Sequence, residues 1–408
     1  MIGFSRTLLI ALTFLTLAGA PAPALAQDRR PLILISIDGF RAEYLERGLT
    51  PTLDALAGAG ARAEAMRPSF PVNTFPNHYT LVTGLRPDRH GLTDNTMFDG
   101  ARPGVKFSMG AREQVMDRFW WDGGEPIWVT AQRQGVRAAT MFWPGSEAAV
   151  RGVRPSIWHI YEEALPAFDR VDRLLGWLDL PMAERPLLMT LYFEAVDTVG
   201  HHSGPDSPEL NEALRTVDLS LARLVAGLTA RGLLHQVNIV IVSDHGMAPT
   251  SPDRLIVLDE QYPAGAFRWI TMGSMAGLIP ADAEVERRLV GRQDHHECWR
   301  KGELPARLNY GSHPRIPPVI CLADAGWTLT TRERQDSRPM TRSGGAHGYD
   351  PHDPTMQAIF VAHGPAFRSG VVLAPFDNVS VYPLLARLLD LTPAPNDGDP
   401  ADTAAALR

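Results

Sequence analysis

Three apolar runs in this chain each end on an aspartate, and this pattern restricts the possible folds more than any other feature. The runs are residues 32–37 before Asp38, residues 187–196 before Asp197 and residues 238–243 before Asp244. Short runs rich in β-branched residues predict strands that are buried in a parallel sheet. Ligands bind beyond the carboxyl ends of such strands. We therefore expect three carboxylates at one edge of a sheet, where they would repel one another unless cations hold them together.

Strands and helices alternate along most of the chain, which predicts an α/β fold. The segment 208–228 has apolar residues at helical spacing, and a strand is expected at 356–362. Further helices are expected at about 52–60, at 168–178 and at 379–389. Another should begin just after the loop 73–78 and end at Gly84, and the segment 129–143 is expected to be a helix followed by a strand. This alternation implies a mostly parallel sheet between layers of helices.

The first 26 residues have the pattern of a secretory signal peptide. Arg6 precedes an apolar stretch at 8–17, and Ala24-Leu25-Ala26 is a small-residue cleavage site. An uncleaved N-terminal anchor is the alternative, because about 20 apolar residues are enough to span a bilayer. We expect cleavage near Ala26, a secreted or periplasmic protein, and no stable membrane insertion.

Residues 27–408 contain no repeat and no linker-like stretch, so a single catalytic domain is expected. From about 252 to 335 the alternation gives way to short strands and turns, which indicates a small insert. The formal net charge of −7 argues against a protein that binds the backbone of a nucleic-acid duplex, because such proteins present a basic face.

The chain has two cysteines, Cys298 and Cys321. In an exported protein a pair of thiols is expected to form a disulfide, and the residues around both cysteines look like strands that could lie side by side. The alternative is that both are small, buried apolar residues.

A candidate metal site is formed by seven residues: Asp38, Thr74, Asp197, His201, Asp244, His245 and His347. Mixed carboxylate and imidazole ligands favour zinc or a neighbouring transition metal, because magnesium and calcium prefer oxygen ligands. Six Asp and His ligands are too many for one catalytic zinc, which usually takes three from the protein. They suit two ions about 3.5–4 Å apart, a spacing that suits phosphoryl displacement.

Each of these features has a simpler explanation when it is taken alone. An aspartate after a strand often caps the next helix. Asp197 and His201 could form a local hydrogen-bonded turn, and Gly344-Gly345 before His347 could be only a flexible loop. The prediction of a metal centre therefore depends on finding all of these features together.

Seven short segments form a recognisable set. They are Ser36-Ile-Asp-Gly-Phe-Arg41, Asn73-Thr-Phe-Pro-Asn-His-Tyr79, Thr83-Gly-Leu-Arg-Pro87, His90-Gly-Leu-Thr-Asp-Asn95, Phe142-Trp-Pro-Gly-Ser146, Ser243-Asp-His-Gly-Met247 and Ala346-His-Gly-Tyr-Asp350. Together they resemble the nucleotide pyrophosphatase/phosphodiesterase family of the alkaline phosphatase superfamily. The resemblance extends from about residue 31 to residue 389. It implies an alkaline-phosphatase-like three-layer sandwich with a small insert.

The resemblance also implies a role for each candidate residue. One zinc ion would be bound by Asp197, His201 and His347. The other would be bound by Asp38, Asp244, His245 and the hydroxyl of Thr74. Thr74 would be the nucleophile and would form a covalent phospho-threonine intermediate. Asn95, which could otherwise be only a turn residue, would donate to a non-bridging phosphate oxygen.

The nucleophile motif indicates the substrate class. The more distantly similar sulfatases and phosphonate monoester hydrolases have Cys or Ser-x-Pro-x-Arg, whereas the same register here has Thr74-Phe75-Pro76-Asn77-His78. The absence of that arginine favours diesters over dianionic monoesters. Phe75 and Tyr161 would contact a base or an acyl group, although Glu162-Glu163-Ala164 departs from the family pattern. Core packing is an equal interpretation for Phe75, Tyr161 and Trp143.

The sequence thus predicts an exported two-zinc phosphodiesterase/pyrophosphatase acting on nucleotides. One alternative keeps the chemistry but has choline phospholipids as substrates. Another alternative, from a different class, is a non-catalytic relative that only binds a ligand.

Overall fold

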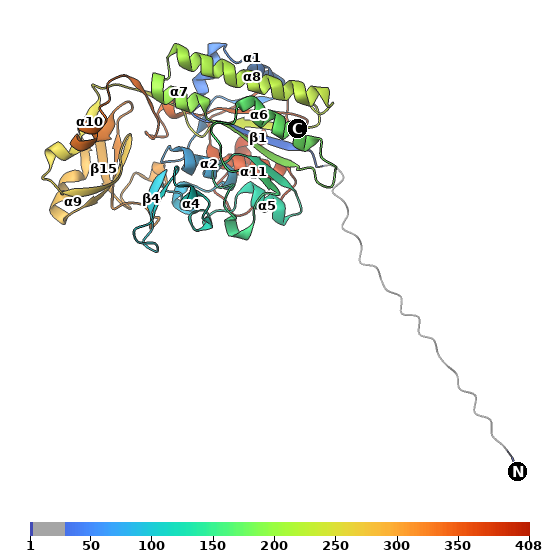
Figure 1. Cartoon of the computed structure of the whole chain (residues 1–408), viewed down its shortest axis with the longest axis horizontal. Helices are drawn as coiled ribbons and strands as arrows, with labels where there is room; N and C mark the ends of the chain where they lie inside the picture. Colours follow the sequence, from blue (N-terminus) through green and yellow to red (C-terminus); the bar gives the residue numbers. More distant parts are fainter. Residues whose placement is uncertain (3–28) are drawn as a thin grey trace.

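An eight-stranded sheet forms the centre of the structure, a computed structural model that describes residues 1–2 and 29–408 (Figure 1). The strand order is β20 (Val371–Leu373), β2 (Ala61–Ala63), β19 (Phe360–His363), β9 (Asn238–Val242), β1 (Leu32–Ile37), β8 (Leu188–Phe193), β6 (Ala138–Met141) and β7 (Ile157–Trp158). Strands β9, β1, β8, β6 and β7 are parallel neighbours, and β19 is antiparallel to β9 and to β2. The expected mostly parallel sheet is confirmed.

The segment interpreted as a signal peptide lies almost wholly outside the described residues. Only its first two residues, Met1 and Ile2, are described. Across the described part of the chain, no helix combines the length and the apolar character needed to cross a membrane.

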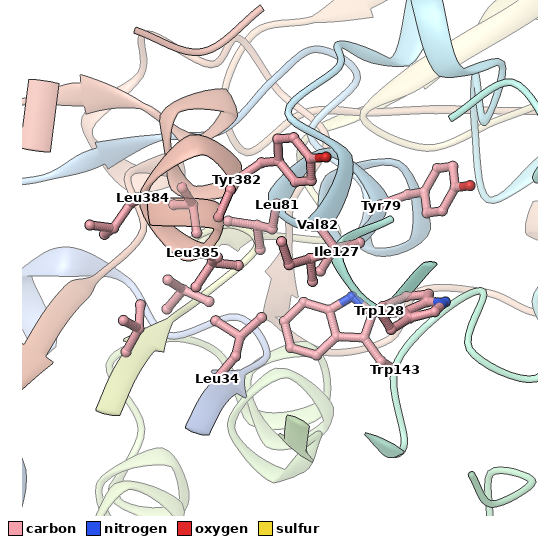
Figure 2. Packing of buried hydrophobic residues seen from close by; sticks show 14 of the residues in the cluster. Leu34, Tyr79, Leu81, Val82, Ile127, Trp128, Trp143, Tyr382, Leu384 and Leu385 are labelled. Atoms are coloured by element: carbon pink, nitrogen blue, oxygen red, sulfur yellow. The ribbon is translucent and has the colours of Figure 1, made fainter. Parts of the chain in front are cut away.

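Helices cover both faces of the sheet and make three layers (Figure 1). One layer holds α1 (Pro51–Ala59), α6 (Ala167–Leu178), α7 (Ala195–Ser203) and α8 (Pro208–Ala230); the other holds α2 (Thr74–Thr83), α5 (Ile127–Arg133) and α11 (Val381–Leu388). Successive residues of a strand point to opposite faces, so Ile33 and Ile35 pack toward α6 and α8. Leu32 and Leu34 pack toward α2, α5 and α11, as Figure 2 shows for Leu34.

The strand expected at 356–362 is shorter, because β19 begins at Phe360. Two other element boundaries differ from the sequence expectation, and both of these differences affect the site. Helix α2 begins at Thr74 and not after the loop 73–78. Pro76 does not prevent this, because a proline in the first turn removes an N–H that has no partner within the helix. The apolar run 187–196 combines strand β8 with the first turn of α7, so Asp197 lies on a helix and not directly after a strand.

A second sheet is built within the segment where an insert was expected. Its five antiparallel strands lie in the order β12 (Phe267–Thr271), β13 (Met275–Pro280), β16 (Val319–Ala323), β15 (His296–Arg300) and β14 (Gly291–Gln293). Cys298 and Cys321 face each other across β15 and β16 and form a disulfide. The expected disulfide is therefore present. This sheet lies at one end of the molecule, beside α9 (Ala283–Leu289) and α10 (Arg332–Ser337) (Figure 1).

Candidate metal centre

The six predicted Asp and His residues converge at the carboxyl ends of the central strands. Asp38 follows β1, Asp244 and His245 follow β9, and Asp197 and His201 lie one turn apart on α7. Ligand atoms lie within 4.8 Å of one another in three groups: Asp197, His201 and His347; Asp38, Asp197 and His245; and Asp38, His78 and Asp244. Residues separated by as many as 309 positions therefore share one site.

A short pair of strands brings His347 to this site. Strand β10 (Ala248–Thr250) starts just after His245, and it pairs with β18 (Gly344–Ala346), which ends just before His347. The two imidazole rings consequently stack, with centroids 3.6 Å apart.

Each of the three imidazoles is fixed with its Nε2 directed to the carboxylates. His201 Nδ1 lies 2.9 Å from Gly345 O, His245 Nδ1 lies 2.9 Å from Gly246 O, and His347 Nδ1 lies 2.8 Å from Val72 O. Because a carbonyl accepts only from a protonated nitrogen, Nδ1 carries the hydrogen and a neutral ring keeps a lone pair on Nε2. Such second hydrogen bonds set the tautomer and orientation of metal-binding histidines.

The carboxylates have oxygens that remain unsatisfied. Asp38 Oδ1, Asp197 Oδ1 and Asp244 Oδ2 are buried and have no hydrogen-bond partner among the described residues. Asp197 Oδ1 lies 3.4 Å from His201 Nε2 and 3.8 Å from His347 Nε2. Buried polar atoms are normally paired, so these oxygens fit a bound cation. The donor set of carboxylates and neutral imidazoles is one that metal ions accept.

The electrostatics of the site also fit a cation. Burial raises the pKa of Asp38 well above its usual value, and the charges of Asp244 and Asp197 raise it further. Burial, together with His245 and His201, lowers the pKa of the His347 imidazole well below its usual value. A neutral imidazole is the form that binds metal, and a cation would restore the charge of the carboxylates.

Thr74 points its hydroxyl at this cluster. It is the first residue of α2, it is 8% exposed, and its Oγ1 lies 3.3 Å from His245 Nε2.

The backbone next to Asp38 can be formed only by a glycine. Gly39 has a φ of +68°, and a Cβ at this position would lie 2.9 Å from the Cα of Asp197. Glycine therefore allows α7 to approach the end of β1 closely.

Three residues that support the cluster were not assigned a role from the sequence. The Tyr192 hydroxyl donates to Asp38 Oδ2 (2.7 Å). His78 has one ring nitrogen 2.9 Å from Thr74 O and the other 2.8 Å from Ser36 Oγ, so both nitrogens have partners within the protein. His78 was visible as part of the nucleophile motif, whereas nothing in the sequence distinguished Tyr192 or Ser36 from other strand residues.

Asn95 lies beside the start of α2. Its Oδ1 accepts a hydrogen bond from the backbone N–H of Phe75 (2.9 Å). The neighbouring Asp94 carboxylate accepts from Asn73 Nδ2 (2.9 Å) and from the Asn95 backbone N–H (2.6 Å). Asp94, which the sequence did not single out, therefore connects the two loops that carry Thr74 and Asn95.

A cavity of about 270 Å³ opens beside the cluster. Asp38, Thr74 and Asp197 line it together with the predicted substrate-binding residues Phe75 and Tyr161. Tyr161 is 41% exposed and has edge contacts with Phe142 and Tyr192; Phe75 also packs against Phe107 and Trp121. Trp143 lines the cavity as well and donates from Nε1 to His78 O (3.0 Å). Phe75 and Trp143 thus both contact neighbouring side chains or backbone of the protein and line the cavity.

Comparison with known proteins identifies the family. A family model described as "Type I phosphodiesterase / nucleotide pyrophosphatase" matches residues 32–350. The chain belongs to this family. The resemblance inferred from the seven sequence segments is confirmed, and so is the alkaline-phosphatase-like architecture, because members of the family belong to that superfamily.

Individual relatives agree with this assignment. An uncharacterized pyrophosphatase/phosphodiesterase of Schizosaccharomyces pombe is 40% identical over 90% of this chain and 78% of its own length. Ectonucleotide pyrophosphatase/phosphodiesterase family member 3 of Rattus norvegicus is 41% identical over 91% of this chain but only 43% of its own length. The chain thus spans less than half of that larger family member.

A solved structure of a family member has the same fold. It is the murine ectonucleotide pyrophosphatase/phosphodiesterase 5, studied as an inactive threonine-to-alanine variant in complex with AMP. It matches with a TM-score of 0.87 and 32% identity, over 93% of this chain and all of that one.

The hydrogen bond from Tyr192 to Asp38 leads to a testable expectation about metal binding. Burial and the neighbouring Asp38 charge raise the pKa of Tyr192, so the phenol stays a donor. We expect Tyr192→Phe to weaken metal retention about 10- to 100-fold, the usual effect of losing a partner of a metal ligand. The measurement is metal content against increasing competing chelator. Tyr44→Phe is the control, because that buried hydroxyl has no hydrogen-bond partner within the described part of the chain. If Tyr192→Phe kept its metal as well as Tyr44→Phe, this role of Tyr192 would be contradicted.

Proposed function

We propose that this family member is a two-zinc enzyme that hydrolyses phosphodiester and phosphoanhydride bonds of nucleotides through a covalent intermediate on Thr74. The observation that carries the proposal is the position of the Thr74 hydroxyl, 3.3 Å from His245, within a cluster of six Asp and His residues. A binding protein without catalysis would have no need for a hydroxyl at the N-terminus of a helix in such a cluster.

The ligands divide into two sets in this proposal. Asp197, His201 and His347 hold one zinc ion. Asp38, Asp244, His245 and the Thr74 hydroxyl hold the other. The group formed by Asp197, His201 and His347 supports the first set. The unsatisfied oxygens of Asp38 and Asp244 and the contact between the Thr74 hydroxyl and His245 support the second. The mixture of nitrogen and oxygen ligands supports zinc over magnesium or calcium.

Two zinc ions bound here supply positive charge that lowers the pKa of a hydroxyl and offsets the charge of the phosphate. The Thr74 oxygen loses its proton to solvent water and forms a bond to phosphorus, while the bond to the leaving oxygen breaks and the leaving group keeps the electron pair. Water then replaces the Thr74 oxygen at phosphorus, and the threonine hydroxyl is regenerated. Asn95, held by its bond to the Phe75 N–H, donates from its amide to a non-bridging phosphate oxygen.

The cavity supports a nucleotide as the group that stays on phosphorus. Phe75 and Tyr161 present aromatic faces within one space that also contains Thr74, and a base can stack on such faces. The complex of the murine relative with AMP supports the same substrate class. We assign Phe75, Asn95 and Tyr161 to substrate binding.

We also propose a domain organisation and a cellular location for the protein. Residues 27–408 act as one catalytic domain with an insert at about 252–335, which corresponds to the segment of the second sheet. The apolar stretch and the cleavage site within residues 1–26 support export, with zinc loaded outside the cytoplasm.

A second candidate substrate is favoured by the charge of the cavity. Glu147, Glu163 and Glu194 line it with several aromatic side chains, and no Lys or Arg is among the described residues that line it. Aromatic rings and carboxylates together bind quaternary ammonium groups. The same chemistry could therefore act on choline phospholipids.

Replacement of the nucleophile provides the direct test. We expect Thr74→Ala to reduce cleavage of the nitrophenyl ester of thymidine monophosphate roughly 10³-fold or more, while the zinc content stays near two per chain. Thr74→Ser is the matched control, because it keeps a hydroxyl and should keep measurable turnover. Unchanged turnover in Thr74→Ala would remove Thr74 from the mechanism.

Metal removal tests the cofactor. Exhaustive treatment with a chelator should abolish diester cleavage, because the Thr74 hydroxyl is a weak nucleophile without a metal ion. Added zinc should restore the activity, and metal analysis should give about two ions per active chain. Full activity in a preparation shown to be free of metal would refute the two-zinc assignment.

A comparison of two nitrophenyl substrates separates the nucleotide from the choline candidate. If the cavity stacks a base, the nitrophenyl ester of thymidine monophosphate should have a higher kcat/KM than nitrophenyl phosphocholine. A preference for nitrophenyl phosphocholine would instead establish the choline substrate. Tyr161→Ala should reduce kcat/KM for the preferred substrate and have a smaller effect on the other one.

A further inference from the structure

Two cavities adjoin the metal centre, and they differ in charge. The first, described above, is lined by five carboxylates and by no Lys or Arg among the described residues. The second has a volume of about 250 Å³ and is lined by His201, His202, Thr250 and residues 339–345. None of the described residues that line it is acidic, and Arg342 contributes a guanidinium.

The two cavities contact different parts of the metal centre. Thr74, Asp38 and Asp197 line the first cavity, whereas His201, which belongs to the same ligand group as Asp197, lines the second. In phosphoryl transfer the attacking and leaving oxygens lie roughly in line on opposite sides of phosphorus. Since the Thr74 oxygen lies beside His245, the leaving oxygen is expected on the side of the group that contains His201. Of the two cavities, the second is the one that His201 lines.

The segment that carries Arg342 is held firmly against α7. A Cβ on Gly344 would lie 2.5 Å from His201 O, and a Cβ on Gly345 would lie 2.5 Å from Gly200 O. Only glycine permits this approach, which also allows His201 Nδ1 to donate to Gly345 O. Arg342 is exposed and lies two residues before this contact, so the backbone places it beside His201.

We propose that the second cavity binds leaving groups that carry phosphate, and that Arg342 selects them. This inference rests on the proposed function. The class includes the pyrophosphate released from a nucleoside triphosphate and the nucleotide released from a dinucleotide. A guanidinium can donate two parallel hydrogen bonds to phosphate oxygens, and a cavity without carboxylates does not repel a polyanion. A leaving group without phosphate, such as nitrophenolate, cannot accept this pair of hydrogen bonds.

The test compares two substrates that share one transferred group. Thymidine triphosphate and the nitrophenyl ester of thymidine monophosphate both place thymidine monophosphate on Thr74, so the contacts in the first cavity are equal. The measured quantity is the ratio of kcat/KM for the triphosphate to kcat/KM for the nitrophenyl ester. We expect Arg342→Ala to lower this ratio on the order of 10-fold or more, as for loss of hydrogen bonds to a charged group.

Arg338→Ala is the matched control, because this arginine is close in sequence but does not line the cavity. In Arg338→Ala the ratio of the two kcat/KM values should stay within about twofold of the wild-type ratio, the range of an ordinary surface substitution. Pyrophosphate as an inhibitor of nitrophenyl ester cleavage gives a second measurement: its inhibition constant should rise about 10-fold in Arg342→Ala and stay unchanged in Arg338→Ala.

The outcomes separate this inference from the proposed function. If the wild type cleaves both substrates and Arg342→Ala leaves the ratio and the pyrophosphate inhibition unchanged, the leaving-group site is refuted while the proposed function stands. If the wild type with zinc cleaves neither substrate, the proposed function fails, and this inference fails with it.

Discussion

Mutual repulsion among the carboxylates of Asp38, Asp197 and Asp244 is the interaction that the surrounding structure has to balance. Two unit charges 4 Å apart repel by about 4 kcal/mol at an effective dielectric constant of 20, and these three groups are almost fully buried or half-buried. Tyr192 offsets part of this repulsion, because its hydroxyl donates a hydrogen bond to Asp38 Oδ2. Each carboxylate nevertheless keeps one unsatisfied oxygen. A bound cation would remove the remaining repulsion, and the residues present fit such an ion.

The backbone around the site has to be correspondingly close-packed. The ligands come from the ends of β1 and β9, from one turn of α7 and from the end of β18, so four separate segments must meet within a few ångströms. Glycines at three points of contact make this possible, at Gly39, Gly344 and Gly345, where a side chain would collide with α7. The pairing of β10 with β18 then fixes the position of His347 relative to His245.

The architecture and the convergence of the candidate ligands could be predicted, because both follow from local patterns. Apolar strands that end on an acidic residue indicate a sheet edge, and the motif around Thr74 is specific to the family. The start of α2 at Thr74 could not be read in the same way, because Pro76 in a first helical turn looks identical to Pro76 in a loop. The extent of β8 was overestimated for a similar reason: Val196 is apolar because it packs in the core on α7, not because it belongs to a strand.

Residues that hold the candidate ligands or Thr74 in place by hydrogen bonds were harder to predict than the candidate ligands themselves. Tyr192 matters because strand β8 lies beside β1 in parallel register, with Ser36 opposite Tyr192, and such a register depends on the tertiary fold. Asp94 and His78 connect segments in the same way. Much of the wall of each cavity is formed by a loop, such as 142–147 in the first cavity and 339–343 in the second. These loops are separate from the strand ends that carry the candidate ligands. If chemistry and recognition are carried by different parts of the chain, as we propose, a loop substitution should alter the preferred leaving group while every candidate metal ligand stays in place.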